Sequence, residues 1–481
     1  MMQFLIAAPR SGSGKTTLTC AVLAALKRRG LDPCSFKSGP DYIDPMFHRA
    51  ALGVDSHNLD LFFSAPDTVR QLYAKGAAGH GAAVCEGAMG LYDGLGGVSD
   101  TASAWHLADT LGLPVLLVVQ PKGASLTLAA EINGLKAFRN PSHLAGILLN
   151  DCAPHLYDLL APMLERETGL PVLGYLPHLP EAAIESRHLG LKTAGEIADL
   201  QQKLERLADA LVLDWDKLLA VTDRRLPPWG KLSPKVTDEG KQCPDGILQE
   251  ITSPHPALTR HLPPRGKASA SLRIAVAKDE AFCFTYAETL EALEEAGAEL
   301  AFFSPLRDTA LPEHTAALYL PGGYPELYAK TLSENEAMLS AIRQAVERGL
   351  PTAAECGGFL YLGQSLEDVG GKSFPMVGVL PGNGFKVGRL VRFGYAALTA
   401  RADGMLFRAG ERLPVHEFHH WDSTDNGTAF AAAKSNGRSW DCGFANEHFY
   451  AGFPHLYWAG TALPRRFVKA AERYRQEEQT L

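Results

Sequence analysis

Several features that would point to a membrane or a nucleic acid are missing from this 481-residue sequence. No apolar run approaches the 18 or more residues of a membrane-spanning helix, and the start leads directly into an apolar strand without a signal peptide. The net charge is −8, whereas a nucleic-acid surface needs clustered lysine and arginine. The eight cysteines include no CxxC pair, so we expect reduced thiols. These absences predict a cytoplasmic protein without a membrane or nucleic-acid partner.

The length of the chain and the changes in residue composition along it predict two domains. An apolar fraction of 46% is typical of soluble globular proteins, and 481 residues exceed one ordinary domain. Residues 1–205 and 272–481 alternate apolar runs with helical stretches, a pattern typical of parallel sheets covered on both faces. From residue 222 to 267 repeated prolines break any helix, and we assign residues 206–271 to a proline-rich connector. The predicted fold class is α/β.

The stretch SGSGKTT, residues 11–17, has the features of a phosphate-binding loop. It follows an apolar run at residues 4–8 and precedes an amphipathic helix, which is the context such a loop requires. The glycines let backbone N–H groups converge on an anion, the lysine reaches terminal phosphates, and Thr16 is placed to bind magnesium. Pro9 stands where the usual pattern has its first glycine. The predicted ATP-binding residues of this loop are Gly12, Gly14, Lys15, Thr16 and Thr17.

Two segments that follow this loop carry a resemblance to a known family. FKSGPDYIDP, residues 36–45, and EGAMGLYDG, residues 86–94, resemble the cobyrinic acid a,c-diamide synthases, which are glutamine-dependent amidases of cobalamin biosynthesis. The sister family that makes cobyric acid has an asparagine-rich segment after the phenylalanine and lysine, so the a,c-diamide branch fits better. The resemblance implies a dethiobiotin-synthetase-like P-loop domain with a parallel sheet and a corrinoid substrate.

Amidation of a carboxylate needs activation, because hydroxide is a poor leaving group and phosphate is a good one. We therefore expect ATP to form an acyl phosphate, with Mg²⁺ neutralising the phosphate charge. Lys37 suits the transferred phosphoryl group or the incoming carboxylate, and Asp93 is a candidate for binding substrate. The alternative for each carboxylate is a turn or a helix cap. The predicted magnesium ligands are Thr16, Asp41, Asp44 and Glu86.

The second half resembles the cobalamin-pathway type of class I glutamine amidotransferase domain. The resemblance rests on AALYLPGGYPE, residues 316–326, and PTAAECGGFLYLG, residues 351–363, and extends to about residue 460. Cys356 lies where a strand bends into a helix, and we expect the helix dipole to lower the pKa of its thiol. Gly357 and Gly323 are predicted to supply oxyanion-hole N–H groups. The alternative is a buried structural cysteine.

A nucleophilic cysteine needs a base, and the family supplies a histidine that aligns with His455 in YAGFPHLYW. In class I domains generally, a glutamate follows two positions later. That position is Tyr457 here, and the cobalamin branch typically lacks the glutamate as well. We therefore expect a Cys–His pair whose imidazole is oriented by some other acceptor.

The segment from His416 to His420 matches H-E-x-x-H, the signature of zinc peptidases. That chemistry needs both histidines on one helical face, but no helical apolar period surrounds them. The a,c-diamide synthases typically have this stretch too, so we interpret it as structural or substrate-facing. Cationic side chains nearby are candidates for pairing with substrate carboxylates, or for an ordinary solvated strand. They are Lys386, Arg389 and Arg392, of which Arg392 is our prediction for substrate binding.

Together these features predict an enzyme that uses ATP, Mg²⁺ and glutamine to amidate the a and c carboxylates of cobyrinic acid. Ammonia released at Cys356 would pass internally to the acyl phosphate at the P-loop site. The same chemistry on hydrogenobyrinate or nickel sirohydrochlorin is the nearest alternative. A partitioning-type nucleotide-switch ATPase with a degenerate amidase-like domain is the rival from another class, although a binding module needs neither Cys356 nor His455. A homodimer is compatible with the sequence, which does not set the oligomeric state.

Overall fold

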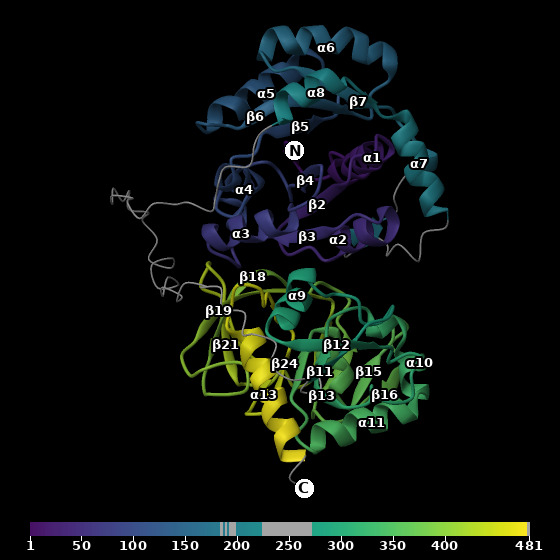
Figure 1. Ribbon diagram of the computed structural model, residues 1–481, viewed down its shortest axis with the longest axis vertical. Coiled ribbons are helices and arrows are strands. Elements are labelled where there is room, and N and C mark those ends of the chain that lie inside the picture. Colours follow the sequence, from purple (N-terminus) through teal and green to yellow (C-terminus); the bar gives the residue numbers. More distant parts are fainter. Residues whose placement is uncertain (183–185, 188–189, 192–198, 224–271, 479–481) are drawn as a thin grey trace. The chain divides into compact units, whose positions relative to one another are not determined.

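The computed structural model describes residues 1–182, 186–187, 190–191, 199–223 and 272–478 (Figure 1). The chain divides into two compact units, Met1–Ser233 and Pro234–Leu481. No helix in the described ranges is long and apolar enough to cross a membrane.

The first unit contains an eight-stranded sheet in the order β10-β7-β6-β5-β1-β4-β2-β3. Neighbouring strands are parallel except β10, which pairs antiparallel with β7. Strands β1, β4, β5, β6 and β7 are largely apolar and buried, as expected for a sheet covered on both faces, whereas β2 and β3 also carry buried polar residues. They are β1 (Met2–Ala7), β2 (Pro33–Ser38), β3 (Ser56–Leu59), β4 (Ala82–Glu86), β5 (Val115–Val119), β6 (Leu144–Asn150), β7 (Val172–Leu176) and β10 (Val212–Leu213).

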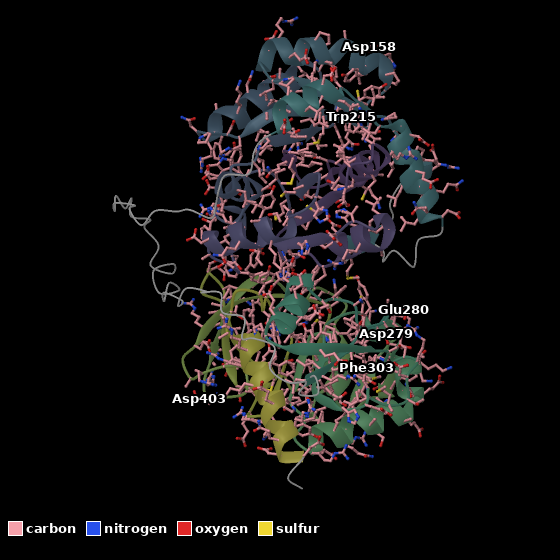
Figure 2. All side chains as sticks on the ribbon, in the orientation of Figure 1. Asp158, Trp215, Asp279, Glu280, Phe303 and Asp403 are labelled. Atoms are coloured by element: carbon pink, nitrogen blue, oxygen red, sulfur yellow. The ribbon has the colours of Figure 1, made fainter. Side chains whose placement is uncertain are left out.

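Helices cover both faces of this sheet, because alternate strand residues enter two separate hydrophobic clusters. One face carries α1 (Lys15–Arg28), α7 (Leu200–Ala210) and α8 (Trp215–Thr222). The other face carries α3 (Pro66–Gly76), α4 (Ala104–Leu111), α5 (Leu126–Phe138) and α6 (Pro154–Thr168). Trp215, labelled in Figure 2, begins α8, and the guanidinium carbon of Arg29 lies 4.2 Å from its ring centroid. This layering confirms the predicted α/β class.

The predicted end of the first domain at residue 205 falls inside α7. Strand β10 and helix α8, which fall in the predicted connector, instead complete the first unit. Leu207 and Leu218 are buried in the cluster beneath α1, and this burial binds both helices to the sheet. The first unit therefore extends past residue 205, to the point near residue 222 where the repeated prolines begin. The remaining part of the predicted connector, residues 224–271, lies outside the described residues.

The second unit has a main sheet in the order β12-β11-β13-β14-β24-β23, parallel except for β23. One face is covered by α10 (Ala329–Glu334), α11 (Glu336–Glu347) and α12 (Gly357–Leu362). Helices α9 (Ala287–Glu295) and α13 (Leu463–Glu478) lie side by side on the other face (Figure 1). The strands of this sheet are β11 (Leu272–Ala277), β12 (Ala298–Phe303), β13 (Thr315–Leu320), β14 (Thr352–Glu355), β23 (Phe444–Ala445) and β24 (Phe449–Gly452).

Two further sheets follow α12 in the second unit. An antiparallel sheet in the order β22-β21-β18-β19-β25 shares a hydrophobic cluster with α9 and α13. A smaller sheet has the order β16-β15-β17-β20. The strands of these sheets are β15 (Ser365–Glu367), β16 (Ser373–Pro375), β17 (Asn383–Lys386), β18 (Arg392–Ala400), β19 (Arg412–His419), β20 (Trp421–Ser423), β21 (Phe430–Ala433), β22 (Ser439–Cys442) and β25 (His455–Leu456).

Candidate active sites

The phosphate-binding loop connects β1 to α1 and is fixed by the end of β6. Gly12 and Gly14 both have positive φ, of 78° and 82°. A Cβ on Gly14 would lie 2.0 Å from Nδ2 of Asn150, which itself donates a hydrogen bond to the Ser13 carbonyl at 3.1 Å. The N–H groups in the first turn of α1 have no intrahelical partner, so they are available to an anion. The loop has the conformation that the sequence predicts.

Lys15 folds its side chain back over this loop. Its ammonium donates to the carbonyls of Arg10, at 3.4 Å, and Met89. Burial and the nearby Lys37 lower the pKa of Lys15 to about 8. The negative charge of a bound phosphate would stabilise the ammonium form of Lys15. Thr17, in the same first turn of the helix, is half-buried.

The structure brings Thr16, Lys37, Asp44 and Glu86 into direct contact. Lys37 and Glu86 are opposed on neighbouring strands β2 and β4, with Nζ 2.7 Å from Oε1. Lys37 also pairs with Asp44, which lies in the short helix α2 (Ile43–Phe47). The Thr16 hydroxyl donates to Glu86 Oε1 at 2.6 Å and reaches Asp44 Oδ2 at 3.4 Å. Residues far apart in the sequence thus form one polar cluster at the helix terminus.

The opposite charges of Lys37 and Asp44 stabilise each other's ionised form. Burial opposes the charge on Lys37, but Asp44 and Glu86 outweigh it and raise the pKa of its ammonium. Burial also acts to raise the pKa of Asp44, but the contact with Lys37 outweighs it and lowers that pKa. The cluster therefore keeps its ammonium and the Asp44 carboxylate charged at neutral pH.

Three of the four predicted magnesium ligands offer oxygen atoms at one place. Among the described residues, the second carboxylate oxygen of Glu86, Oε2, is buried without a hydrogen-bond partner. Mg²⁺ in nucleotide sites usually takes one or two protein carboxylates together with substrate phosphates and water. Thr16, Asp44 and Glu86 therefore fit a magnesium ion.

Asp41, the fourth predicted ligand, forms a helix cap. Its Oδ1 accepts hydrogen bonds from the backbone N–H groups of Ile43, at 2.8 Å, and Asp44, at 3.3 Å. Burial and the neighbouring Asp44 raise the pKa of Asp41 to about 6. This arrangement corresponds to the capping alternative considered for the carboxylates.

Asp93, predicted to bind substrate, lies in the loop after β4. Its Oδ2 accepts a hydrogen bond from the Gly90 N–H at 3.0 Å, so it stabilises the turn. It is also close enough to Lys15 for its negative charge to raise the pKa of that ammonium against the larger effect of burial. The structure places Asp93 next to the phosphate-binding loop.

Cys356 occupies the sharp bend between β14 and α12 that the sequence predicts. Its φ of 49° and ψ of −101° are unusual for a residue with a side chain, and such strain is common at nucleophiles. The backbone N–H donates to the Gly452 carbonyl at 2.8 Å, which fixes the bend to β24. Cys356 is buried, with 7% of the residue exposed.

The predicted lowering of the Cys356 pKa is wrong. Burial, followed by the negative charges of Glu326 and Glu417, raises the pKa of the thiol above its ordinary value. The Gly357 N–H acts in the opposite direction but is outweighed. Helix α12 has six residues, so its dipole is weaker than desolvation of the sulfur by its surroundings. The thiol is protonated in the structure at neutral pH.

The structure brings the two predicted oxyanion-hole glycines together. A Cβ on Gly357 would lie 3.0 Å from the backbone nitrogen of Gly323 and 2.9 Å from Cδ of Pro325. The neighbouring N–H of Gly358 donates to the Pro321 carbonyl at 3.1 Å and is not available to substrate. The N–H groups of Gly323 and Gly357 remain the predicted oxyanion-hole pair.

A turn after β11, which the sequence analysis did not single out, supports Gly323. Asp279 accepts hydrogen bonds from the N–H groups of Ala281, at 2.9 Å, and Phe282, at 3.1 Å. The Ala281 carbonyl then accepts from the Tyr324 N–H at 2.9 Å. Asp279 is labelled in Figure 2 near the end of β11, and its second oxygen accepts from the Ser304 hydroxyl at 2.8 Å. An Asp two residues before an Ala-Phe pair is a turn signal, but its connection to Gly323 depends on the tertiary fold.

His455 lies next to Cys356, as the resemblance implies. A Cβ on Gly322 would lie 2.6 Å from Cε1 of His455 and 3.5 Å from Cβ of Cys356, so both side chains flank this glycine. The imidazole is buried, and its Nδ1 lies 3.7 Å from Oε2 of Glu355. The ring of Tyr457 packs against Tyr286 instead, with centroids 5.1 Å apart.

The H-E-x-x-H segment begins on strand β19, with His416 opposite His455 on β25. Residues four apart along a strand are separated by about 13 Å, so His416 and His420 do not have the spacing of one zinc site. The strand conformation therefore differs from the helical peptidase signature.

Arg392, predicted to bind substrate, lies next to the carboxylate of this segment. Its Nε is 3.8 Å from Glu417 Oε2, and its guanidinium carbon is 5.1 Å from the ring centroid of Trp440. The Trp440 indole donates to Glu417 Oε1 at 3.2 Å. Lys386 donates to the Val369 carbonyl at 2.7 Å, and Arg389 is exposed. Of these three cations, only Arg392 is paired with a carboxylate by these contacts.

Comparisons with known proteins match both halves of the chain. Residues 4–191 match the CobQ/CobB/MinD/ParA nucleotide binding domain, and residues 273–462 match the CobB/CobQ-like glutamine amidotransferase domain. Proteins named cobyrinate a,c-diamide synthase are similar over nearly the full length. The relative from Clostridium acetobutylicum is 38% identical, covering 96% of this chain and 98% of its own. The relative from Salmonella typhimurium is 37% identical with 95% of each chain covered, and that from Thermoplasma volcanium is 35% identical with 99% and 98% covered. These matches confirm both resemblances.

Proposed function

Because the chain belongs to the cobyrinate a,c-diamide synthase family, and is thus a glutamine-dependent amidating ligase, we propose that it uses ATP and glutamine to amidate the a and c carboxylates of cobyrinic acid. The observation that carries the proposal is that one chain holds the residues for both halves of the reaction. A phosphate-binding loop with a charged cluster lies in the first unit, and a strained cysteine beside a histidine lies in the second.

In the first unit, a substrate carboxylate attacks the γ-phosphorus of ATP, and ADP leaves. Lys15 binds the terminal phosphates, while Lys37 lies beside the transferred phosphoryl group and offsets its charge. Ammonia then attacks the acyl phosphate and phosphate leaves, giving the amide. Asp44 and Glu86 support this role, because their pairing holds Lys37 charged and in place.

Magnesium belongs to this proposal. When bound, it would neutralise charge on the phosphates, and Thr16, Asp44 and Glu86 would hold it. The buried, unpartnered Oε2 of Glu86 supports this assignment.

In the second unit, His455 takes the proton from the Cys356 thiol as the sulfur attacks the side-chain amide of glutamine. The N–H groups of Gly323 and Gly357 stabilise the resulting oxyanion. His455 returns the proton to the leaving nitrogen, and ammonia departs. Water then hydrolyses the thioester to glutamate. Because the pKa of the thiol is raised, this transfer to His455 is required for the attack.

Mass spectrometry of the products tests the proposal directly. The protein is incubated with ATP, Mg²⁺ and glutamine together with cobyrinic acid, hydrogenobyrinate or nickel sirohydrochlorin. We expect the mass change of two carboxyl-to-amide conversions on cobyrinic acid. The same change on another tetrapyrrole, with none on cobyrinic acid, would reassign the substrate. Absence of glutamine hydrolysis would instead favour a nucleotide-switch ATPase.

A further inference from the structure

A buried glutamate immediately before the nucleophile faces the catalytic histidine. Glu355 ends strand β14 and is 1% exposed. Its Oε2 lies 3.7 Å from Nδ1 of His455, which is within ion-pair distance. Its other oxygen, Oε1, accepts a hydrogen bond from the Trp458 indole at 3.0 Å. The carboxylate is thus anchored at one oxygen and directed toward His455 with the other.

Aromatic side chains hold this carboxylate in a fixed orientation. Trp458 is fully buried, and its ring centroid lies 5.5 Å from that of Tyr319 on β13. Burial and Glu355, which also forms a side-chain hydrogen bond with Tyr319, raise the pKa of the tyrosine hydroxyl, so it stays protonated as a donor. A carboxylate in a buried site needs such donors, because desolvation without hydrogen bonds is costly.

We propose that Glu355 is the residue that orients His455 for glutamine hydrolysis, in place of the glutamate that class I domains carry two positions after the histidine. The proposal rests on the proposed reaction at Cys356. Glu355 acts through His455 and is therefore a positioning residue. Tyr457, at the usual position, packs against Tyr286 and carries no carboxylate, whereas Oε2 of Glu355 lies 3.7 Å from Nδ1 of His455.

The geometry determines which ring nitrogen serves as the base. A carboxylate that accepts a hydrogen bond from Nδ1–H leaves Nε2 unprotonated and available to the Cys356 thiol. The same carboxylate stabilises the imidazolium that forms when the proton is transferred. The separation of 3.7 Å is longer than a hydrogen bond, and catalytic contacts of this kind commonly shorten when substrate binds.

Two titratable neighbours of His455 in the described part of the chain, His416 and Cys356, do not supply this charge, whereas the carboxylates of Glu326 and Glu417 lie close enough to Cys356 to raise its pKa. His416 faces it from β19, and burial together with His455 lowers the pKa of His416 to about 3, so it is neutral near pH 7. The Cys356 thiol is neutral as well, because burial, Glu326 and Glu417 raise its pKa. Glu355 lies on the strand that leads into the nucleophile and has the carboxylate directed at Nδ1.

The variant Glu355→Gln in the full chain tests the proposal. Its amide can still accept from Trp458, but its NH₂ group would face Nδ1 and favour the wrong tautomer. We expect kcat for glutamine hydrolysis to fall about 10²- to 10⁴-fold, as such tautomer changes do in other hydrolases, with KM for glutamine nearly unchanged. Ammonia-dependent synthesis should remain at the wild-type level. Glu355→Asp, which restores the carboxylate, should recover part of the activity.

A pH profile separates positioning from a merely structural role. If Glu355 acts through His455, the pH dependence of kcat/KM should change in Glu355→Gln, whereas a merely structural change would lower the rate by the same factor at every pH. Glu288→Gln is the matched control, since it neutralises another buried glutamate of the second unit. It should leave both the rate and the profile unchanged.

The outcomes distinguish this proposal from the proposed function. If wild-type protein hydrolyses glutamine, Cys356→Ser does not, and Glu355→Gln retains the wild-type rate and profile, the positioning role is wrong while the function stands. If wild-type protein shows no hydrolysis, the function itself fails. Should Glu355→Gln not fold, Trp458→Phe removes the anchoring indole N–H instead. That variant is expected to lose about 3- to 10-fold in glutamine kcat, since one hydrogen bond to a charged group is removed, and an unchanged kcat would overturn the proposal.

Discussion

Each candidate site lies at the carboxyl ends of parallel strands in its own unit. The two sites differ in whether their reactive side chains are charged before substrate binds. In the first unit, Lys37, Asp44 and Glu86 form ion pairs. In the second, burial keeps the Cys356 thiol protonated. Backbone conformation differs too, since Gly12 and Gly14 adopt positive φ without a side chain and Cys356 adopts it with one.

The difference follows from the chemistry each site is proposed to perform. The first site is proposed to bind an anion, the phosphates of ATP. Its charged side chains can therefore be in place before ATP binds. A thiolate, in contrast, is reactive toward any electrophile or oxidant, and a protonated thiol is inert until a base removes the proton. The first site is therefore charged in advance, whereas the nucleophile of the second site becomes charged only during the reaction.

The largest expected effect separates the two sites completely. Cys356→Ser should lower glutamine-dependent synthesis by at least about 10³-fold and leave ammonia-dependent synthesis intact. Lys15→Ala should abolish synthesis with either nitrogen donor, because the ATP phosphates lose their cation. Both variants are assayed with both donors. If Cys356→Ser used glutamine at the wild-type rate, Cys356 would not be the nucleophile. If Lys15→Ala used ammonia at the wild-type rate, the ATP site would not be at the phosphate-binding loop.

The next effect ranks the carboxylates of the first site. Neutralising any one of Asp41, Asp44 and Glu86 should slow synthesis with either nitrogen donor. Asp44→Asn and Glu86→Gln should lower kcat about 10²- to 10³-fold, since both contact Lys37 and Thr16. Asp41→Asn should cost less, about 10-fold, because its carboxylate caps α2. Steady-state rates at saturating ATP and Mg²⁺ measure the order. Wild-type rates in all three variants would contradict the assignment.

A third measurement addresses the state of the thiol. The raised pKa of Cys356 predicts slow alkylation by iodoacetamide near pH 7 and a rate that increases through pH 9 without a plateau. The sign follows because the reactive thiolate is the deprotonated form, and its fraction grows as the pH approaches the pKa from below. Peptide mass spectrometry gives the rate at Cys356 itself. An alkylation rate that reaches a plateau below pH 7 would show that Cys356 is already a thiolate in the free enzyme. The proposed difference between the two sites would then be wrong.

The smallest effect concerns backbone strain. At an ordinary position, glycine is less stable than alanine by about 0.5–1 kcal/mol. At Cys356, where φ is 49°, we expect Cys356→Gly to be more stable than Cys356→Ala by about 1 kcal/mol, because glycine avoids the strain. Urea unfolding of both variants under the same conditions gives the difference. Greater stability of the alanine variant would mean that the bend is not strained.

Local patterns in the sequence were sufficient for much of the fold. The apolar run predicted at residues 4–8 lies largely in β1 (Met2–Ala7), since a short apolar run before a glycine-rich turn has few alternatives. The phosphate-binding loop and the bend at Cys356 were also predictable, because glycine spacing and strand–turn–helix order are local properties. The boundary at residue 205 was missed, since attachment of β10 and α8 depends on a strand pairing and on burial against the sheet.

The sequence by itself determined the residue types: a lysine and glycines for phosphate, and a cysteine with a histidine for glutamine. The tertiary structure decided how these groups interact. It directed Asp41 to a helix cap, raised the Cys356 pKa through burial, and brought Glu355 to the imidazole of His455. The physical reason is that desolvation and ion pairing depend on distances between residues far apart in the chain. Residue identity alone does not specify those distances.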